Sequence, residues 1–409
     1  MKDLSIYIHI PFCVRKCLYC DFLSFPVGKI PDLWKKPTIK SYANLLCQEV
    51  TASAPSYREH RVISVFWGGG TPSLLPAEEV SSIMDVIRER YQVAQDAEIT
   101  MEMNPETVDG GKMKQYITAG INRISIGLQS ADDRELSRIG RIHDYRSFLT
   151  AYDLARRNGF HNINVDLMAA LPEQSISSYE RTLEQVSALA PEHISAYSLI
   201  LEEGTPLYER QSEYRFPTEE EDREMYLLTR EFLASKGYHR YEISNYARKG
   251  YECRHNKVYW QRGDYVGFGL GASSMVQNVR WSNPHTLEAY TIYTEQLSEQ
   301  CAADSECVRR PEGQASYEQK PEAAYIPDKQ VLTRQEQMEE FMFLGLRMVC
   351  GVSAAEFARI FGRSIGDVYG QVIDNLCRQE LLVRENDRIR LTDRGLDVSN
   401  YAMAQFLFD

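Results

Sequence analysis

Short apolar runs alternate with amphipathic stretches over the first half of the chain. The runs are rich in β-branched and aromatic residues, are bounded by turn residues, and cover residues 4–10, 63–67, 98–103, 123–127, 162–167 and 194–199. Between them, apolar residues recur with helical spacing over residues 78–91, 108–119, 145–157 and 177–189. Such alternation predicts an α/β domain with a parallel sheet. Six units would form either an open sheet or an incomplete (β/α)6 TIM-like barrel, and we predict the barrel.

The residues that follow these runs are polar or glycine. Because the carboxyl ends of barrel strands meet at one face and carry the chemistry there, we expect one shared mouth. Its predicted members are Cys13, Gly68, Gly69, Gly70, Thr71, Glu102, Asn104, Gln129, Asp166 and Tyr197.

The alternation stops near residue 205, and a different pattern follows. A helix is predicted at 219–235, a strand at 240–243 and an aromatic, glycine-rich stretch at 253–275. Three helices at 334–349, 353–361 and 365–378, a hairpin at 381–391 and a last helix from 392 resemble a winged helix. We therefore divide the chain into a partial barrel (1–235), a barrel extension (236–300), a Glu-, Gln-, Pro- and Ala-rich insert or linker (301–330) and a C-terminal winged-helix-like α+β domain (331–409).

Composition and charge narrow the functional classes. The 409 residues are 43% hydrophobic and 25% charged, which is typical of globular proteins. The net charge of −12, and Asp367 and Asp374 on the third C-terminal helix, argue against a nucleic-acid partner. No signal peptide and no stretch of roughly 20 apolar residues is evident, so we expect a cytoplasmic protein.

The chemistry is concentrated in three of the nine cysteines. Cys13, Cys17 and Cys20 have the spacing C-x3-C-x2-C directly after the first strand. Thiolates favour iron–sulfur clusters or zinc. A structural zinc site needs four ligands, and the next cysteine, Cys47, is distant and lies in a helical pattern. Three thiolates on a cubane leave one iron open to a further ligand, which favours the cluster.

This cysteine motif, with the aromatic Tyr19 before its last cysteine, resembles the radical S-adenosylmethionine superfamily. The resemblance implies a [4Fe–4S] cluster on Cys13, Cys17 and Cys20, and S-adenosylmethionine on the open iron. Segments 7–13, 67–73 and 127–130 narrow the resemblance to oxygen-independent coproporphyrinogen III dehydrogenases and HemW-type heme chaperones. It covers nearly the whole chain except the 301–330 insert.

The narrower resemblance implies residues for two S-adenosylmethionine molecules. Tyr7, Gly69 and Glu102 would contact the first. The contacts to the second would be Tyr19, Gly70, Thr71, Gln129, Arg141 and Asp166. His9 lies on the same strand face as Tyr7, because side chains alternate with period two, and we expect it to support the cluster site.

Two features separate the chaperones from the dehydrogenases. Phe22 stands where the dehydrogenases carry a further cysteine, and Cys20-Asp21-Phe22 matches the chaperones. The second feature is the H-N-x-x-Y-W signature at 255–260. It implies His255 as the heme-iron ligand, Asn256, Tyr259 and Trp260 as heme contacts, and Cys253 as a second ligand or attachment point. The alternative is that His255 and Asn256 cap a turn while Tyr259 and Trp260 fill a core.

The function predicted from these residues is a heme chaperone that binds heme, a [4Fe–4S] cluster and S-adenosylmethionine. It would transfer heme to acceptor proteins, and whether a membrane protein is a transient acceptor stays open. The first alternative is an oxygen-independent coproporphyrinogen III dehydrogenase that decarboxylates its substrate by radical chemistry. The second is an iron–sulfur DNA-binding regulator.

Overall fold

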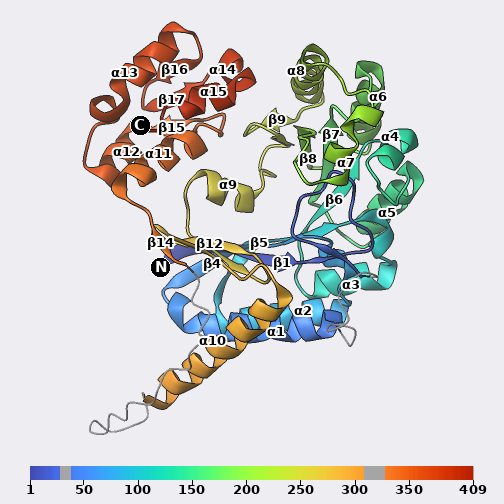
Figure 1. The fold of residues 1–409 in the computed structure, drawn as a ribbon, viewed down its shortest axis with the longest axis vertical. Helices are drawn as coiled ribbons and strands as arrows, with labels where there is room; N and C mark the ends of the chain where they lie inside the picture. Colours follow the sequence, from blue (N-terminus) through green and yellow to red (C-terminus); the bar gives the residue numbers. More distant parts are fainter. Residues whose placement is uncertain (28–37, 308–327, 409) are drawn as a thin grey trace.

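The computed structural model describes residues 1–27, 38–307 and 328–408, and its centre is a twelve-stranded mixed sheet (Figure 1). Six long strands occur in the sheet in the same order as along the chain, and neighbouring ones run parallel. They are β1 (Lys2–Ile10), β4 (His60–Gly69), β5 (Gln92–Met103), β6 (Arg123–Gln129), β7 (Ile163–Ala169) and β8 (His193–Ser198). Each contains one predicted run or nearly all of it, so the predicted α/β class is confirmed.

Further strands extend this parallel core on both sides. Strand β11 (Tyr265–Phe268) pairs parallel with β1 and is followed outward by β12 (Ser273–Val276), β13 (Val279–Ser282) and β14 (Gln330–Val331). At the other edge, β10 (Asn245–Ala247) pairs antiparallel with β8 and is followed by β9 (His239–Arg240). The strand order ends at β14 and β9, so this sheet is open. The strand predicted at 240–243 is limited to β9.

The connecting helices lie where helical spacing was found. The observed helices that match predicted ones are α2 (Ala77–Arg90), α3 (Gly110–Thr118), α5 (Tyr145–Arg157), α6 (Ile176–Ala188) and α8 (Glu219–Ser235). Capping boxes at Ser175 and Thr218 start α6 and α8, because each side chain satisfies a free backbone N–H of the first turn. The helical pattern around Cys47 forms α1 (Thr38–Ser53). The structure adds α4 (Asp133–Arg138), the single turn α7 (Pro206–Glu209) and the two-residue strands β2 (Phe12–Cys13) and β3 (Phe25–Pro26).

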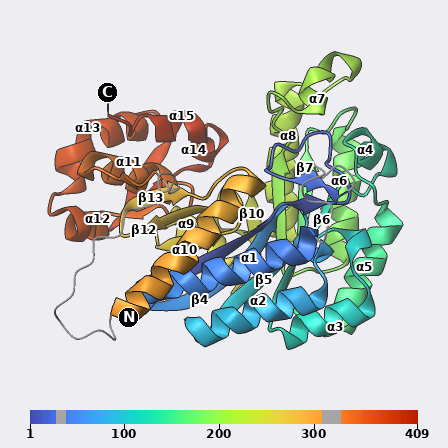
Figure 2. The same ribbon diagram turned by 60° about the horizontal axis from the view of Figure 1, so that its bottom comes forward.

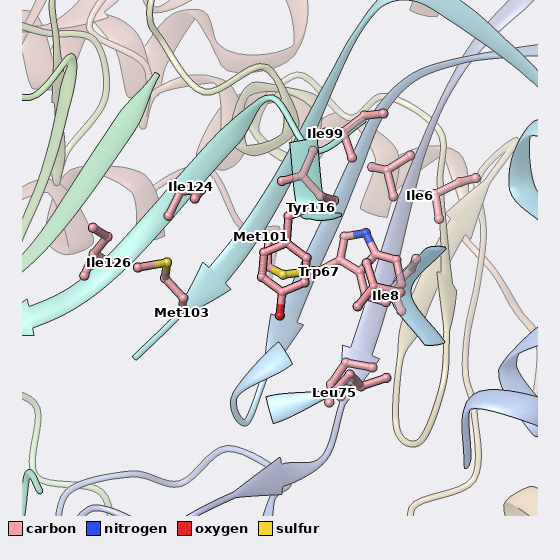
Figure 3. Packing of buried hydrophobic residues seen from close by; sticks show 14 of the residues in the cluster. Ile6, Ile8, Trp67, Leu75, Ile99, Met101, Met103, Tyr116, Ile124 and Ile126 are labelled. Carbon is pink, nitrogen blue, oxygen red and sulfur yellow. The ribbon is translucent and has the colours of Figure 1, made fainter. Parts of the chain in front are cut away.

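The two faces of the parallel strands differ in polarity. One face is apolar and packs under helices such as α1 and α2; Figure 3 shows Ile6, Ile8, Trp67, Met101 and Ile124 from four neighbouring strands in this core. The opposite face carries the alternate residues, since successive side chains of a strand point to opposite sides. These are largely polar and buried or half-buried: Ser5, Tyr7, Ser64, Glu98, Thr100, Glu102, Arg123, Ser125, Asn164 and Asp166.

Two helices connect this sheet to the rest of the chain. The short helix α9 (Arg254–Trp260) covers the polar face, while α10 (Leu287–Cys307) packs beside α1 (Figures 1 and 2). Residues 301–307, predicted as the start of an insert, form the end of α10, because the helical hydrogen bonding continues through them. Gln330, the last residue of the predicted insert, is the first residue of β14. Residues 308–327 of the predicted insert lie outside the described residues.

A second core lies in the C-terminal unit, which we define as residues 334–408. Its elements are α11 (Arg334–Gly345), β15 (Val352–Ser353), α12 (Ala354–Phe361), α13 (Ile365–Arg378), β16 (Leu382–Glu385), β17 (Arg388–Leu391), α14 (Asp393–Asp397) and α15 (Ser399–Ala404). Phe357, Ile373 and Phe406 lie at the centre of this core. The predicted helices and hairpin are present, although the first helix ends at Gly345. Across the described ranges, we find no helix long and apolar enough to span a membrane.

Candidate functional site

A cavity of about 330 Å³ opens at the carboxyl ends of the parallel strands. Its walls come from the cysteine loop after β1 and from the ends of β4, β5, β6, β7 and β8. Among the predicted site residues, those that line it are Cys13, Cys17, Tyr19, Cys20, Gly69, Gly70, Thr71, Glu102, Gln129, Arg141 and Asp166. The strand ends therefore do meet at one mouth.

Two of the three loop cysteines accept hydrogen bonds from polar side chains. Thr71 Oγ1 lies 3.6 Å from Cys13 Sγ, and Arg141 Nη1 lies 3.5 Å from Cys17 Sγ. Burial, with the nearby Cys17 sulfur, raises the pKa of Cys20 to about 11. A thiol in such a place becomes a thiolate when a metal takes the place of its proton.

The arrangement differs from that of a single-ion site. In the described part of the chain, no three His, Cys, Asp or Glu side chains converge closely enough to hold one metal ion. A cubane cluster does not need such convergence, because each of its irons takes its own thiolate. Three cysteines spread along one cavity wall, with donors to two of their sulfurs, therefore fit a cluster better than a zinc ion.

A chain of hydrogen bonds ties these donors together. Arg141 Nη2 donates to Asn104 Oδ1 at 2.7 Å, and Asn104 Nδ2 donates to Thr71 Oγ1 at 3.0 Å. Arg141 also donates to the Gly127 carbonyl. This network runs from one cysteine sulfur to another and fixes the guanidinium inside the cavity. The sequence predicts Asn104 only as a strand-end residue, although its side chain links the two donors.

Glycines are required where the β4 strand reaches the cavity. Gly69 has φ +107°, and a Cβ there would lie 2.5 Å from the His9 ring. A Cβ on Gly70 would lie 2.7 Å from the Phe12 carbonyl oxygen. Both positions therefore exclude a side chain, and the strand backbone itself forms the cavity wall.

Two carboxyl groups stand close together inside the cavity. Burial, and to a lesser extent the charge of Asp166, raises the pKa of Glu102 to about 8. Burial also raises the pKa of Asp166, although Ser125 Oγ and Asn164 Nδ2 donate to its carboxylate at 3.0 and 2.7 Å. Paired carboxyl groups of this kind favour a cationic ligand, because each destabilises the charge of the other.

The far wall contains two residues predicted at the strand ends, Gln129 and Tyr197, and several residues for which no role was predicted. Gln129 adopts φ +76°, which is uncommon for a non-glycine residue and is concentrated at functional sites. Tyr197 donates to its Oε1 at 3.3 Å. The lining residues without a predicted role include Arg15, Ser125, Met168, Ile200 and Glu202. Strand position could have indicated Ser125, which is two residues before Gly127.

Tyr7 lies on the same polar face but does not line the cavity. Its hydroxyl bonds His9 Nδ1 at 3.1 Å, and His9 Nε2 bonds the Leu23 carbonyl oxygen at 2.8 Å. Tyr7 also lies near His255, with ring centres 6.5 Å apart. It therefore separates the cavity from the segment at 255–260.

His255 is enclosed on the inner side of α9. His255 is only 1% exposed. Its ring stacks on the ring of Phe66, with the two ring centres 5.0 Å apart. Nδ1 bonds Ser64 Oγ at 3.0 Å and Nε2 bonds Tyr259 Oη at 2.9 Å. Burial lowers the pKa of His255 to about 3, so the imidazole is neutral. Because both ring nitrogens have partners, a bond to iron would require one of these hydrogen bonds to break.

The start of α9 is tied to β5 by one carboxylate. Glu98 accepts from the backbone N–H groups of Arg254 and His255, both at 3.1 Å, and from Cys253 Sγ at 3.4 Å. Cys253 is fully buried. Asn256 is half-buried. The guanidinium of Arg347 lies 4.3 Å from the ring centre of Trp260, so this tryptophan faces the C-terminal unit.

Comparison with known proteins agrees with this architecture. The family model of the radical SAM superfamily matches residues 7–186, and that of the HemN C-terminal domain matches residues 332–398. The solved structure of coproporphyrinogen III oxidase (HemN) from Escherichia coli superimposes with a TM-score of 0.79 at 23% identity, covering 99% of this chain and 90% of that one. The fold and cysteine loop are therefore those of a radical SAM protein.

Curated relatives define the group more closely. The heme chaperone HemW of Bacillus subtilis (strain 168) is 33% identical over 406 residues, which is 98% of this chain and 99% of the relative. HemW of Escherichia coli (strain K12) is 40% identical over 277 residues, 68% and 71% of the two chains. The mouse protein "Radical S-adenosyl methionine domain-containing protein 1, mitochondrial" is 31% identical over 405 residues, 96% and 85% of the two chains. The chain belongs to the HemW family.

Proposed function

We propose that this protein is a heme chaperone that binds heme as cargo and passes it to acceptor proteins. We further propose that the cavity at the strand ends holds a [4Fe–4S] cluster and S-adenosylmethionine. The observation that carries the cofactor proposal is the set of three cysteines along one cavity wall, with Thr71 and Arg141 donating to two of their sulfurs. Full-length similarity to proteins named heme chaperones supports the cargo.

In this proposal Cys13, Cys17 and Cys20 hold the cluster. When bound, the cluster supplies an electron-donating centre with one open iron for the amino-acid part of S-adenosylmethionine. The Arg141 guanidinium stabilises the thiolate charge, since a charge-assisted hydrogen bond is stronger than a neutral one. Gly69 and Glu102 are assigned to the first S-adenosylmethionine, together with Tyr7, which does not itself line the cavity. A second molecule is assigned to Tyr19, Gly70, Thr71, Gln129, Arg141 and Asp166.

Phe22 favours the chaperone over the dehydrogenase. It lines the cavity rim with 62% of its surface exposed, where the dehydrogenases carry a thiol. The same proposal treats the six parallel strands as an incomplete (β/α)6 barrel that is extended over residues 236–300. It treats residues 331–409 as a winged-helix-like domain, and the separate core around Phe357 and Ile373 supports that division.

The experiment is anaerobic cluster reconstitution of the full chain followed by titration with hemin, with and without S-adenosylmethionine. We expect a shifted Soret band that saturates near one hemin per chain. Absence of any shift would contradict the chaperone. Formation of protoporphyrinogen from coproporphyrinogen III in the same preparation would favour the dehydrogenase, and salt-dependent binding of duplex DNA would favour the regulator.

His255→Ala belongs in the same titration, because iron ligation by His255 is still a prediction. Loss of the Soret shift in a folded variant supports that role. Unchanged hemin affinity and an unchanged spectrum would show that His255 is not the iron ligand. Its role would then be structural, through its hydrogen bonds to Ser64 and Tyr259.

A further inference from the structure

Two cavities adjoin between α9 and the C-terminal unit, away from the cysteine cavity. One encloses about 610 Å³ and the other about 460 Å³, which is the size range of small-molecule sites. Met348, Cys350 and Arg388 line both of them, so the two meet at these residues. We call this combined space the α9 cleft.

The walls of the α9 cleft are held in place by polar contacts. Arg262 Nε lies 3.1 Å from Glu340 Oε2, and Arg280 Nη2 lies 2.8 Å from Glu340 Oε1. Arg347 stacks on Trp260. These contacts hold the C-terminal unit against α9 and β13, so the packing of these elements sets the shape of the cleft.

The two halves of the α9 cleft differ in chemistry. The smaller cavity offers the apolar and aromatic surface of Trp260, Phe341, Ile360 and Val352, beside the polar side chains of Gln261, Arg262, Ser353 and Glu356. The larger is lined by four cations, Arg240, Lys257, Arg388 and Arg390, and by two carboxylates, Glu252 and Glu385. A ligand that fits both halves has a flat apolar body and anionic groups at one edge.

Two of those cations are available to an anionic ligand. Arg390 pairs with Glu385 at 2.6 Å, and Arg240 lies 3.7 Å from Asp393. Lys257 and Arg388, by contrast, form no ion pair among the described residues. Arg388 uses one nitrogen to donate to the Gly351 carbonyl oxygen at 3.3 Å. Its other guanidinium nitrogens can donate to a carboxylate.

An exposed thiol stands where the two halves meet. Cys350 is exposed, and its Sγ has one weak contact, at 3.7 Å to the Gly351 carbonyl oxygen. A cysteine thiolate is a common axial ligand of heme iron. Cys350 lines both halves of the cleft, so a porphyrin that spans them would bring its iron close to this residue.

Helix α9 explains why the signature at 255–260 would accompany such a site. His255 and Tyr259 face the sheet and bond each other, whereas Lys257 and Trp260 line the α9 cleft on the other side. His255 and Tyr259 therefore anchor α9 to the sheet, and α9 positions Lys257 and Trp260 at the cleft.

We propose that the α9 cleft binds the heme cargo, with Arg388 and Lys257 on the propionates. In this proposal Cys350 is the iron ligand in place of His255, whose two ring nitrogens are already bonded to Ser64 and Tyr259. The proposal rests on the proposed heme-chaperone function. Binding forms one sulfur–iron bond, and the thiol proton leaves to solvent; no electron is transferred.

The test is titration of the reconstituted full chain with hemin and, separately, with metal-free protoporphyrin IX. Arg388→Gln is compared with Arg384→Gln, which lies outside the cleft on β16 and pairs with Asp374. Cys350→Ser is compared with Cys377→Ser on α13. We expect Arg388→Gln to weaken both ligands about tenfold, because one charge-assisted hydrogen bond is lost. Cys350→Ser is expected to change the hemin spectrum and weaken hemin at least about tenfold, without affecting protoporphyrin IX.

The outcomes separate this proposal from the one it rests on. If wild-type protein binds hemin and both cleft variants match their controls, the cleft is not the heme site and the chaperone proposal stands. If Cys350→Ser alone matches its control, the iron ligand is overturned. If wild-type protein binds no hemin, both proposals are wrong. Unchanged cluster absorbance and thermal unfolding show that each variant is folded.

Discussion

Two regions on the polar face of the central sheet contain similar residue types but differ in structure. At the carboxyl ends of the strands, cysteines, carboxyl groups and an arginine border an open cavity. Further along the same face, α9 covers Ser64 and Glu98, which form hydrogen bonds with His255 of that helix. Both regions contain Cys, His or Glu in patterns that indicate chemistry. Only the first leaves such groups facing space that a ligand can enter.

Glu98 and Glu102 show the difference on a single strand. They lie four residues apart on β5, so both point to the polar face. Glu98 accepts hydrogen bonds from the start of α9. Glu102 lines the cavity beside Asp166, and its pKa is raised to about 8. A buried carboxylate with donors stabilises a fold, whereas a carboxyl group in a ligand cavity carries a cost in the absence of its ligand.

The largest expected effect separates the two regions by their cysteines. Cys17→Ser should abolish the cluster absorbance after anaerobic reconstitution, because a serine hydroxyl is a poor substitute for a thiolate on iron. Cys253→Ser should retain it, since Cys253 lies buried beneath α9. Visible spectra and iron content measure both. Equal loss in the two variants would show that the two regions are one site.

The second prediction concerns the hydrogen bonds under α9. His255→Ala removes the partner of Tyr259 Oη and one of the two partners of Ser64 Oγ, which still bonds Ser5, and it empties a packed space. We therefore expect a loss of about 2–4 kcal/mol in the free energy of unfolding. His161→Ala, at an exposed position, should change it by less than about 0.5 kcal/mol. Urea unfolding measures both. A His255→Ala variant as stable as wild type would mean that the network contributes little and that the residue serves a ligand.

The smallest expected effect uses the two glutamates on β5. The raised pKa of Glu102 means that the folded chain keeps this proton while the unfolded chain ionises, so stability falls as the pH rises from about 4.5 to about 8. Without cluster, Glu102→Gln should therefore be more stable than wild type at pH 8, by on the order of 1–3 kcal/mol, with little difference near pH 5. Glu98→Gln should instead lose about 1–2 kcal/mol, because an amide nitrogen would face backbone donors.

Urea unfolding of both glutamate variants at pH 5 and pH 8 checks this contrast. A stabilising effect of Glu98→Gln, or a destabilising one of Glu102→Gln at pH 8, would reverse the assignment of the two carboxyl groups.

The sequence by itself determined the local elements and the cysteine loop. Strands β1 and β4–β8 were predictable because β-branched runs bounded by turns specify strands locally, and parallel order brings their carboxyl ends together. That reasoning located Cys13, Thr71, Glu102 and Asp166 at one mouth, as the cavity lining confirms. The residue spacing was also sufficient to identify the cysteine motif, because all three thiols lie in one short loop.

Only the tertiary structure decided which side of α9 each residue faces and which polar groups are already satisfied. His255 and Trp260 lie about 1.4 turns apart on α9, so the first side chain faces Ser64 and the second faces Arg347. Asn104 joins two donors that are distant in sequence, Arg141 and Thr71. A motif specifies residue types, but burial and partners depend on packing between remote segments, and that packing determines whether a side chain supports the fold or meets a ligand.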